Sequence, residues 1–344
     1  MTDRSVVVAM VVIAGVVFSA LPATAQEASG NAAGWIVPRT ADGRPDLQGV
    51  WANNNVTPLQ RPEGLGGRER LTAEELARVK ANADRLFGSD AGDAAFGDQF
   101  FVAALSEQAE FTSSDTGTGN YNQFWLVERD FDDRTALIVD PPSGRMPPLT
   151  TVAERTQEAR TAYLRDHPAD GPEDRGLSER CLNFGVPKLN AGYNSYTQIF
   201  QTPGYMALFH EMSHQARIIP MDGRPHLGDD IRQWNGDPRG RWDGDTLVVE
   251  TTNLSRKSSP LVAPGSEHLH LIERYTRVGP DTLHYEVTLT DRSTWTRPWT
   301  VLIPLRRSDD AIFEYACHEG NYGMEGILAG HRAQEQAEAR PASK

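Results

Sequence analysis

The sequence predicts a mainly β fold, in which an antiparallel, barrel-like domain carries irregular and helical decoration on its N-terminal side. After Gln198 the chain consists of segments rich in β-branched and aromatic residues. Turn-forming pairs such as Asp222-Gly223 and Asp243-Gly244 separate these segments. Regular spacing of this kind suits an antiparallel meander, and a meander of about eight strands removes its exposed edges most simply by closing on itself.

The strands expected in this domain follow one another closely along the chain. They are 199–201, 205–209, 215–220, 246–252, 270–278, 282–290, 296–305 and 312–317. Two earlier strands are expected at 121–129 and 135–140. A weak internal repeat supports the meander, because Asp245-Thr-Leu and Asp281-Thr-Leu each follow a turn and enter a strand in the same way.

Helices are expected mainly before the barrel. Thr72 and Glu75 form a capping box at the start of segment 71–87, whose apolar residues then recur with helical spacing on one face. A second helix is expected over 151–166. Residues 88–120 show no strong period and include a Ser/Thr/Gly-rich stretch, so we expect a loop there.

The N-terminus has the pattern of a secretory signal peptide. A mostly apolar run from Val6 to Leu21 leads to Ala23 and Ala25, the small-x-small pattern that signal peptidase requires. The run is short for a membrane span. We therefore expect a periplasmic or secreted protein with no membrane span after signal removal. The expected organisation is a signal peptide (1–25), an irregular and helical segment (26–120), the barrel-like domain (121–330) and a flexible tail (331–344).

Charge and cysteine content narrow the possible partners. The formal net charge is −13, and such a surface repels a phosphate backbone, so no nucleic-acid partner is expected. The chain has two cysteines, Cys181 and Cys317. An even number in an oxidising compartment predicts one disulfide, the alternative being two separate buried thiols. No C-x-x-C pattern indicates a thiol-based zinc site.

Four sequence blocks occur together in this chain. They are 40–47 with 49–51, 217–220 with Asp222-Gly-Arg-Pro-His226, the run Gly-Arg-Trp-Asp-Gly-Asp-Thr-Leu-Val-Val at 240–249, and Cys317-His-Glu-Gly-Asn-Tyr-Gly323. With these blocks the chain resembles a large family of secreted bacterial proteins of unknown function, over nearly all of its length after the signal peptide. The resemblance implies export and no particular activity. The strand pattern of the second half also resembles lipocalins and calycins, which implies a barrel that holds one small ligand.

The segment His210-Glu-Met-Ser-His214 is a literal H-E-x-x-H motif. In zinc proteases a helix places both histidines on one face and the glutamate beside the metal-bound water. Here strand-forming segments lie on both sides, and in a strand Glu211 points away from the two histidines. A metalloprotease is therefore not expected.

We instead expect imidazole and carboxylate groups from distant segments to meet inside the barrel. Five of the nine histidines lie between residues 210 and 270. The expected catalytic residues are Glu211, His214, Arg217, His226, His270 and Glu319. Arg217 is expected to orient an anionic group. The chemistry is either His/Glu acid–base catalysis or catalysis by a divalent metal such as zinc, for which His214, His226 and His270 are the expected ligands.

Four further residues are expected to contact the substrate: Arg224, Trp234, Asn321 and Tyr322. The expected function is a periplasmic or secreted enzyme, a hydrolase, lyase or isomerase, that acts on a small organic molecule. The alternative is a non-catalytic, lipocalin-like carrier. An enzyme should place a histidine next to a carboxylate in a cavity, whereas a carrier should enclose an apolar cavity.

Overall fold

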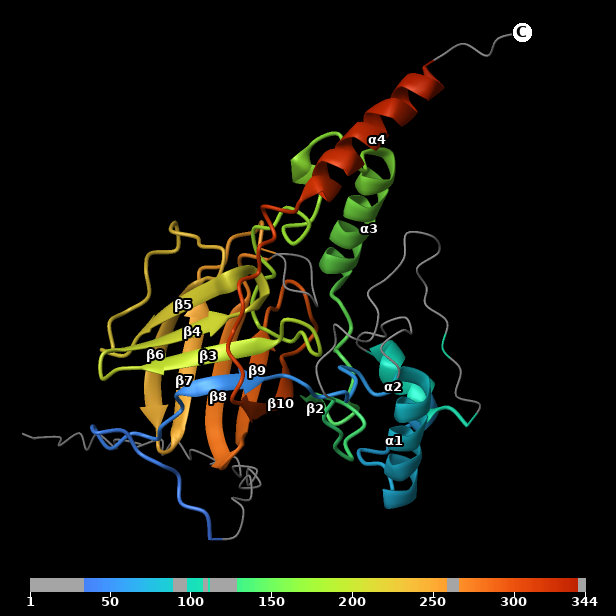
Figure 1. Cartoon of the computed structure of the whole chain (residues 1–344). Helices are drawn as coiled ribbons and strands as arrows, with labels where there is room; N and C mark the ends of the chain where they lie inside the picture. The colour runs from blue at the N-terminus through green and yellow to red at the C-terminus, as the bar shows by residue number, and fades with distance from the viewer. Residues whose placement is uncertain (1–33, 89–97, 108–110, 112–128, 259–265, 340–344) are drawn as a thin grey trace, which may run out of the picture.

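The computed structural model describes residues 34–88, 98–107, 111, 129–258 and 266–339. The expected signal peptide (1–25) and almost all of the strand expected at 121–129 lie outside these residues. Figure 1 shows a β barrel, a pair of short helices beside it, and a second pair of helices that extends away from it. No helix in the described ranges combines the length and the apolar character needed to cross a membrane.

The barrel is one antiparallel ladder, and among the described residues its strands follow the order β5-β4-β3-β1-β10-β9-β8-β7-β6. The two end strands, β5 and β6, pack against each other, so the ladder is nearly closed. This confirms the predicted mainly β, barrel-like fold. The strands are β1 (Gly49–Ala52), β3 (Tyr196–Gln201), β4 (Tyr205–His210), β5 (Gln215–Pro220), β6 (Asp237–Asp243), β7 (Thr246–Thr252), β8 (His270–Gly279), β9 (Thr282–Thr290) and β10 (Trp299–Ser308); β2 (Ile138–Asp140) pairs with β10 outside this order.

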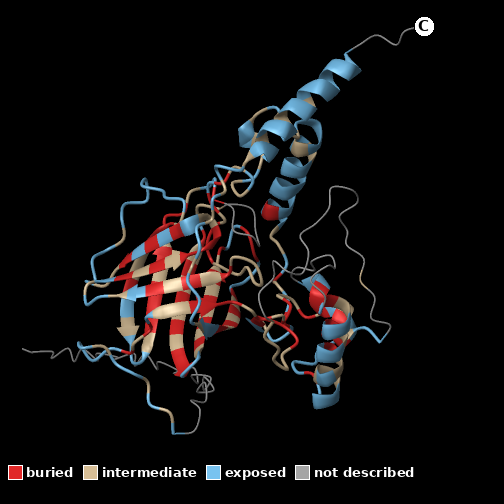
Figure 2. Cartoon of the chain, viewed as in Figure 1, coloured by how far each residue is buried: buried red, intermediate tan, exposed pale blue. Residues whose placement is uncertain are grey.

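The barrel interior is filled because successive strand residues point to opposite faces. In β9, for example, Leu283, Tyr285, Val287 and Leu289 are buried and the residues between them are partly exposed. Figure 2 shows a similar alternation of buried and partly exposed residues on several other strands, such as β8. Apolar side chains from most of the barrel strands meet in one core, around Trp51 of β1.

Gly240 permits the contact between β5 and β6 that nearly closes the barrel. A Cβ atom at this position of β6 would lie 2.9 Å from Cγ2 of Ile219 in β5 and would also meet the sulfur of Met221. Real Cβ atoms do not approach that closely, so any larger residue would force the side chains of Ile219 and Met221 to move. Glycine at position 240 therefore leaves room for the side chains of Ile219 and Met221.

The N-terminal segment does not form a unit separate from the barrel, in contrast to the boundary predicted at residue 120. Strand β1 lies between β3 and β10, and Trp51 pairs with Thr197 on one side and Arg307 on the other. A single four-residue strand is too short to show a period, so β1 was not predicted within the irregular and helical segment 26–120.

The first helix, α1 (Ala73–Phe87), is confirmed with its capping box. The backbone N–H of Glu75 donates to Oγ1 of Thr72 at 3.1 Å, and the N–H of Thr72 donates to the Glu75 carboxylate at 2.9 Å. A further helix, α2 (Asp98–Leu105), lies where a loop was expected. Phe100 and Phe101 bury it against α1, so tertiary packing rather than sequence period defines it.

The second helix pair consists of α3 (Thr151–Asp166) and α4 (Tyr322–Glu338), and α4 contacts the loop that follows α3 (Figure 1). Helix α3 was predicted, but the flexible tail predicted from residue 331 is wrong, because α4 continues to Glu338. The strand predicted at 312–317 is also absent, and this segment has no regular structure. Short 3-10 turns occur at Glu63–Leu65, Pro172–Asp174 and Met212–His214.

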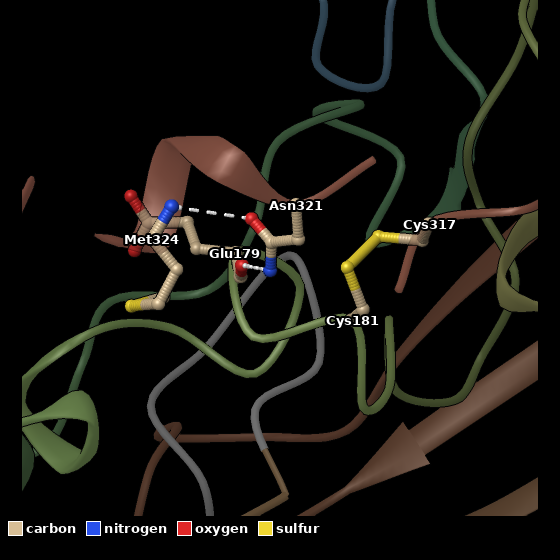
Figure 3. The surroundings of a disulfide bond; sticks show 5 residues. All are labelled: Glu179, Cys181, Cys317, Asn321 and Met324. Atoms are coloured by element: carbon tan, nitrogen blue, oxygen red, sulfur yellow. Dashed lines mark hydrogen bonds between the residues drawn. A yellow bond between two sulfur atoms is a disulfide. The ribbon is translucent and has the colours of Figure 1, made fainter. Parts of the chain in front are cut away.

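The predicted disulfide joins Cys181 to Cys317 just before α4 (Figure 3). Asn321 then begins the helix: its Oδ1 accepts from the backbone N–H of Met324 at 3.2 Å, and its Nδ2 donates to the Glu179 carbonyl at 2.9 Å. Helix α4 buries none of its residues (Figure 2), so these contacts hold its first turn on the protein in place of an apolar core.

Candidate functional site

The H-E-x-x-H segment forms a β hairpin and not a helix. His210 is the last residue of β4, Met212–His214 make a tight 3-10 turn, and Gln215 begins β5. Ser213 and His214 both adopt positive φ angles, +60° and +35°, to complete the turn. His210 therefore ends inside the barrel, whereas His214 is exposed. The two imidazoles do not share a face, and the geometry of a zinc protease is not present.

Arg217 lies inside the barrel, but its partner is a protein carboxylate. Its two Nη atoms donate to the two oxygens of Glu273 at 2.9 and 2.6 Å, and both side chains are 1% exposed. The expectation that Arg217 orients an anionic substrate is therefore corrected, because its two-pronged contact is already used. The alternation of β5 and β8 brings the two residues together, since each occupies an inward position.

Hydroxyl groups surround the Arg217–Glu273 pair. Thr251 accepts from Arg217 at 3.0 Å, and Tyr275 and Tyr285 donate to the Glu273 carboxylate at 3.3 and 2.9 Å. Burial alone would raise the pKa of Glu273, but the Arg217 charge and these hydrogen bonds outweigh it and hold the pKa below its usual value. Burial, together with the Glu273 charge, raises the pKa of both tyrosines well above 10. The pair is therefore a permanently ionised part of the barrel interior.

Next to this network lies a small recess whose lining includes Lys188 and His210. The Lys188 amine donates to the side-chain oxygen of Gln215. Burial, and then the nearby Arg217 charge, lowers the pKa of Lys188 to about 7. Burial, followed by the charges of Lys188 and Arg217, also lowers the pKa of His210 well below 6.5. His210 is therefore a neutral imidazole, and Lys188 is a partly neutral amine near pH 7.

The recess connects the barrel interior with the surface. Three of the residues that line it, His210, Tyr275 and Tyr285, are buried. Asn190 and Tyr196 also line it and keep part of their surface exposed. Its free space is about 20 Å³, which is room for a single water-sized group. This is far below the several hundred Å³ of an ordinary ligand cavity.

Several polar atoms of the recess have no hydrogen-bond partner among the described residues. They include Nε2 of His210, Oγ of Ser195 and Oδ1 of Asn53. The other nitrogen of His210, Nδ1, lies 2.8 Å from the hydroxyl of Thr197, which fixes the plane of the ring. Buried polar atoms normally have partners, so this set is suited to the polar end of a bound molecule.

Sequence analysis did not identify Lys188. It is one lysine in the segment Val186-Pro-Lys-Leu189, with no motif around it. His210 was noted, but only as part of the H-E-x-x-H motif. The sequence does place the charged Lys188 within an apolar stretch, but this pattern is not specific for a functional lysine.

The other expected catalytic residues lie apart, each with its own surroundings. His226 pairs with Asp237 at 3.1 Å in the loop between β5 and β6, and His270 pairs with Glu250 at 2.7 Å on the outer face of β8. Glu211 is buried beside the hairpin turn, where it accepts from the N–H of Phe313 at 3.3 Å. Glu319 is exposed in the segment after the disulfide.

The structure does not bring His214, His226 and His270 together, so the metal site predicted from them is wrong. In the described ranges, one group of three or more His, Cys, Asp or Glu side chains has ligand atoms within 4.8 Å of one another, and it consists of Asp170, His331 and Glu335. These residues lie on or beside α4, outside the barrel. A closed sheet gathers inward side chains, but of His210 and the three expected histidine ligands only His210 is buried.

The residues expected to contact substrate also separate. Arg224 pairs with Asp222 and also donates to the hydroxyl of Tyr205. Hydrogen bonds from Arg224 lower the pKa of Asp222 to about 2. Trp234 is 44% exposed and lines a broad surface groove of about 830 Å³. Asn321 caps α4, and Tyr322 is 78% exposed. None of these four residues lines the recess of Lys188 and His210.

No family model, curated protein or solved structure matches the chain. The resemblance of its sequence blocks to secreted bacterial proteins therefore stays a prediction.

Proposed function

We propose that this protein is an exported enzyme that performs general acid–base chemistry on a small organic molecule at the recess of Lys188 and His210. The observation that carries the proposal is a lysine with a pKa near 7 beside a neutral imidazole with an unpartnered Nε2. Titratable groups shifted in this way concentrate at functional sites. A base is most effective when its pKa lies near the working pH.

The two groups divide the chemistry between them. The neutral form of Lys188 accepts a proton, and its protonated form returns one. His210 stays uncharged, and its Nε2 serves as a hydrogen-bonding contact for the reacting group. The positive charge of protonated Lys188 favours a transition state that develops negative charge on oxygen. Enolisation of a carbonyl compound and hydrolysis of an ester or lactone both develop such charge.

The small size of the recess limits the substrate. Only a reacting end, such as one carbonyl group, fits in about 20 Å³, and the rest of the molecule would rest on the partly exposed rim. The same observation weighs against the carrier function, because a carrier needs an apolar cavity and this barrel is filled by side chains such as Tyr275 and Tyr285.

Proton exchange offers a direct test that does not require a known substrate. Small ketones, esters and lactones would be incubated with the protein in D₂O and followed by NMR for deuterium at the α carbon and for hydrolysis. We expect one class to react faster with the wild type. Lys188→Met should slow that reaction by about 100-fold or more, whereas the matched surface variant Lys80→Met should not. A Lys188→Met protein as fast as the wild type would refute the proposal.

Export is the second part of the proposal. A disulfide between Cys181 and Cys317 is the arrangement that oxidising compartments favour. We expect the protein in the periplasm or medium of its own host, with its N-terminus near residue 26. Intact full-length protein in the cytosolic fraction would contradict this.

A further inference from the structure

Helix α4 projects away from the barrel with no buried residue, and it needs other contacts to stay in place (Figures 1 and 2). An isolated helix of its length is marginal in water. The disulfide and Asn321 hold its first turn. The second attachment is at its middle, where Arg332 donates to the carbonyl of Ala169 at 2.9 Å and His331 faces Asp170. Both partners belong to the loop that follows α3.

The side chains at this second attachment have the chemistry of metal ligands. Nε2 of His331 lies 3.1 Å from Oδ1 of Asp170 and 3.5 Å from Oε1 of Glu335. His331 and Glu335 are four residues apart on α4, so both point to one face. The His331 side chain is 13% exposed, and the carboxylates are 43% and 45% exposed.

The two separations measured from His331 fit the coordination shell of zinc. With Zn–N and Zn–O bonds of about 2.0–2.1 Å, two ligands of a tetrahedral ion lie about 3.3 Å apart. The two distances from His331 fall on either side of this value. One imidazole and two carboxylates also balance the charge of a divalent ion.

His167, at the end of α3, has its Nδ1 2.7 Å from the second oxygen of Asp170. It is not part of the group whose ligand atoms all lie within 4.8 Å of one another, so we expect water to complete the shell. Arg332 competes with the ion for the Glu335 carboxylate, since its Nη1 lies 3.3 Å from the other oxygen of Glu335.

We propose that Asp170, His331 and Glu335 bind one Zn²⁺ ion that pins α4 to the loop after α3. The role is structural: the ion and the disulfide attach the helix at two points along its length. The site is separate from the recess of Lys188 and His210, and it does not depend on the proposed reaction.

Titration of Zn²⁺ into the metal-stripped full chain, purified without a histidine tag, tests this site. We expect one ion per chain with micromolar or tighter affinity by calorimetry. His331→Ala and Glu335→Gln should each weaken binding by about tenfold or more. His318→Ala and Glu338→Gln change the same residue types just outside the site, and they should bind as the wild type does. These residues are at the surface, so the variants should still fold.

Limited proteolysis supplies the second measurement. Trypsin cleavage after Arg332 should slow when Zn²⁺ is added to the wild type, and it should not slow in His331→Ala. No binding by the wild type, or equal binding by His331→Ala, would overturn the proposal. Binding without protection of Arg332 would overturn its structural role.

Discussion

Arg217 and Glu273 form a two-pronged ion pair inside the barrel, although 56 residues separate them in the sequence. Both lie on inward faces of strands that are not neighbours in the ladder. Moving two charges out of water is costly, and the pair is tolerated because threonine and tyrosine hydroxyls complete its hydrogen bonds. The Arg217 charge adds to burial in lowering the pKa of Lys188.

Breaking this pair should be strongly destabilising. In Glu273→Gln the Arg217 charge stays buried without its counter-ion, so the free energy of unfolding measured in urea should fall by about 3–5 kcal/mol. The exposed pair Arg297–Asp140 is the control, and Asp140→Asn should cost less than about 1 kcal/mol. A double change, Arg217→Met with Glu273→Leu, should recover part of the loss. Equal effects of the buried and exposed changes would contradict the burial of the pair.

Stability should rise with pH because of Lys188. Its pKa is about 7 in the folded protein and near its ordinary value of 10.5 in the unfolded chain. Between these pH values the unfolded chain binds more protons, so the free energy of unfolding increases from about pH 7 to pH 10. Lys188→Met should remove this increase in thermal unfolding scans, and Lys80→Met should keep it. Parallel curves for the wild type and Lys188→Met would show that the amine is not buried.

The disulfide should protect both the whole fold and the start of α4. It joins two residues that are 136 positions apart in the sequence. By the chain-entropy account, removing a cross-link that closes so long a loop lowers the free energy of unfolding by up to about 5 kcal/mol. The double variant Cys181→Ala/Cys317→Ala should unfold at lower urea concentration and be cut faster after Arg332. Dithiothreitol should shift the wild type toward the variant and leave the variant unchanged. A wild type indifferent to reductant would argue against the bond.

The contact between β5 and β6 should depend on Gly240. The Cβ of an alanine would overlap Ile219 and Met221, so Gly240→Ala should destabilise the barrel by about 1–3 kcal/mol. Gly326→Ala is the matched control, because its Cβ would meet no atom within 4 Å on exposed α4. That change should be neutral or slightly stabilising. A neutral Gly240→Ala would mean that the Ile219 and Met221 side chains move aside at little cost, so that this contact does not depend on glycine.

Local patterns predicted the elements whose cause is local. The capping box of α1 lies within four residues, and the alternation of β9 lies within one strand, so both were readable without tertiary structure. By contrast, α2 and β1 are short and are defined by what they pack against. At 312–317 strand propensity favoured a state that the fold does not adopt. Residues 331–338 continue α4 with no buried residue, so packing does not explain that error.

The candidate site was harder to predict than the fold. Sequence analysis expected several histidines to meet inside a closed sheet, but His226 and His270 pair with carboxylates outside it. The inward or outward direction of a side chain changes with a shift of one residue in a strand boundary. His210 ends β4 and faces inward, whereas His214 sits in the turn and faces water.

The sequence by itself determined the mainly β barrel-like class, the capped first helix and the single disulfide, because composition, short-range period and the number of cysteines carry that information. Only the tertiary structure decided that Lys188 lies beside His210, that Arg217 is held by Glu273, and that His331 faces Asp170. The physical reason is that a pKa, a charge pair and a ligand set depend on distances between residues far apart in the chain. Register and burial fix these distances inside the barrel, and the contact of α4 with the loop after α3 fixes them outside it.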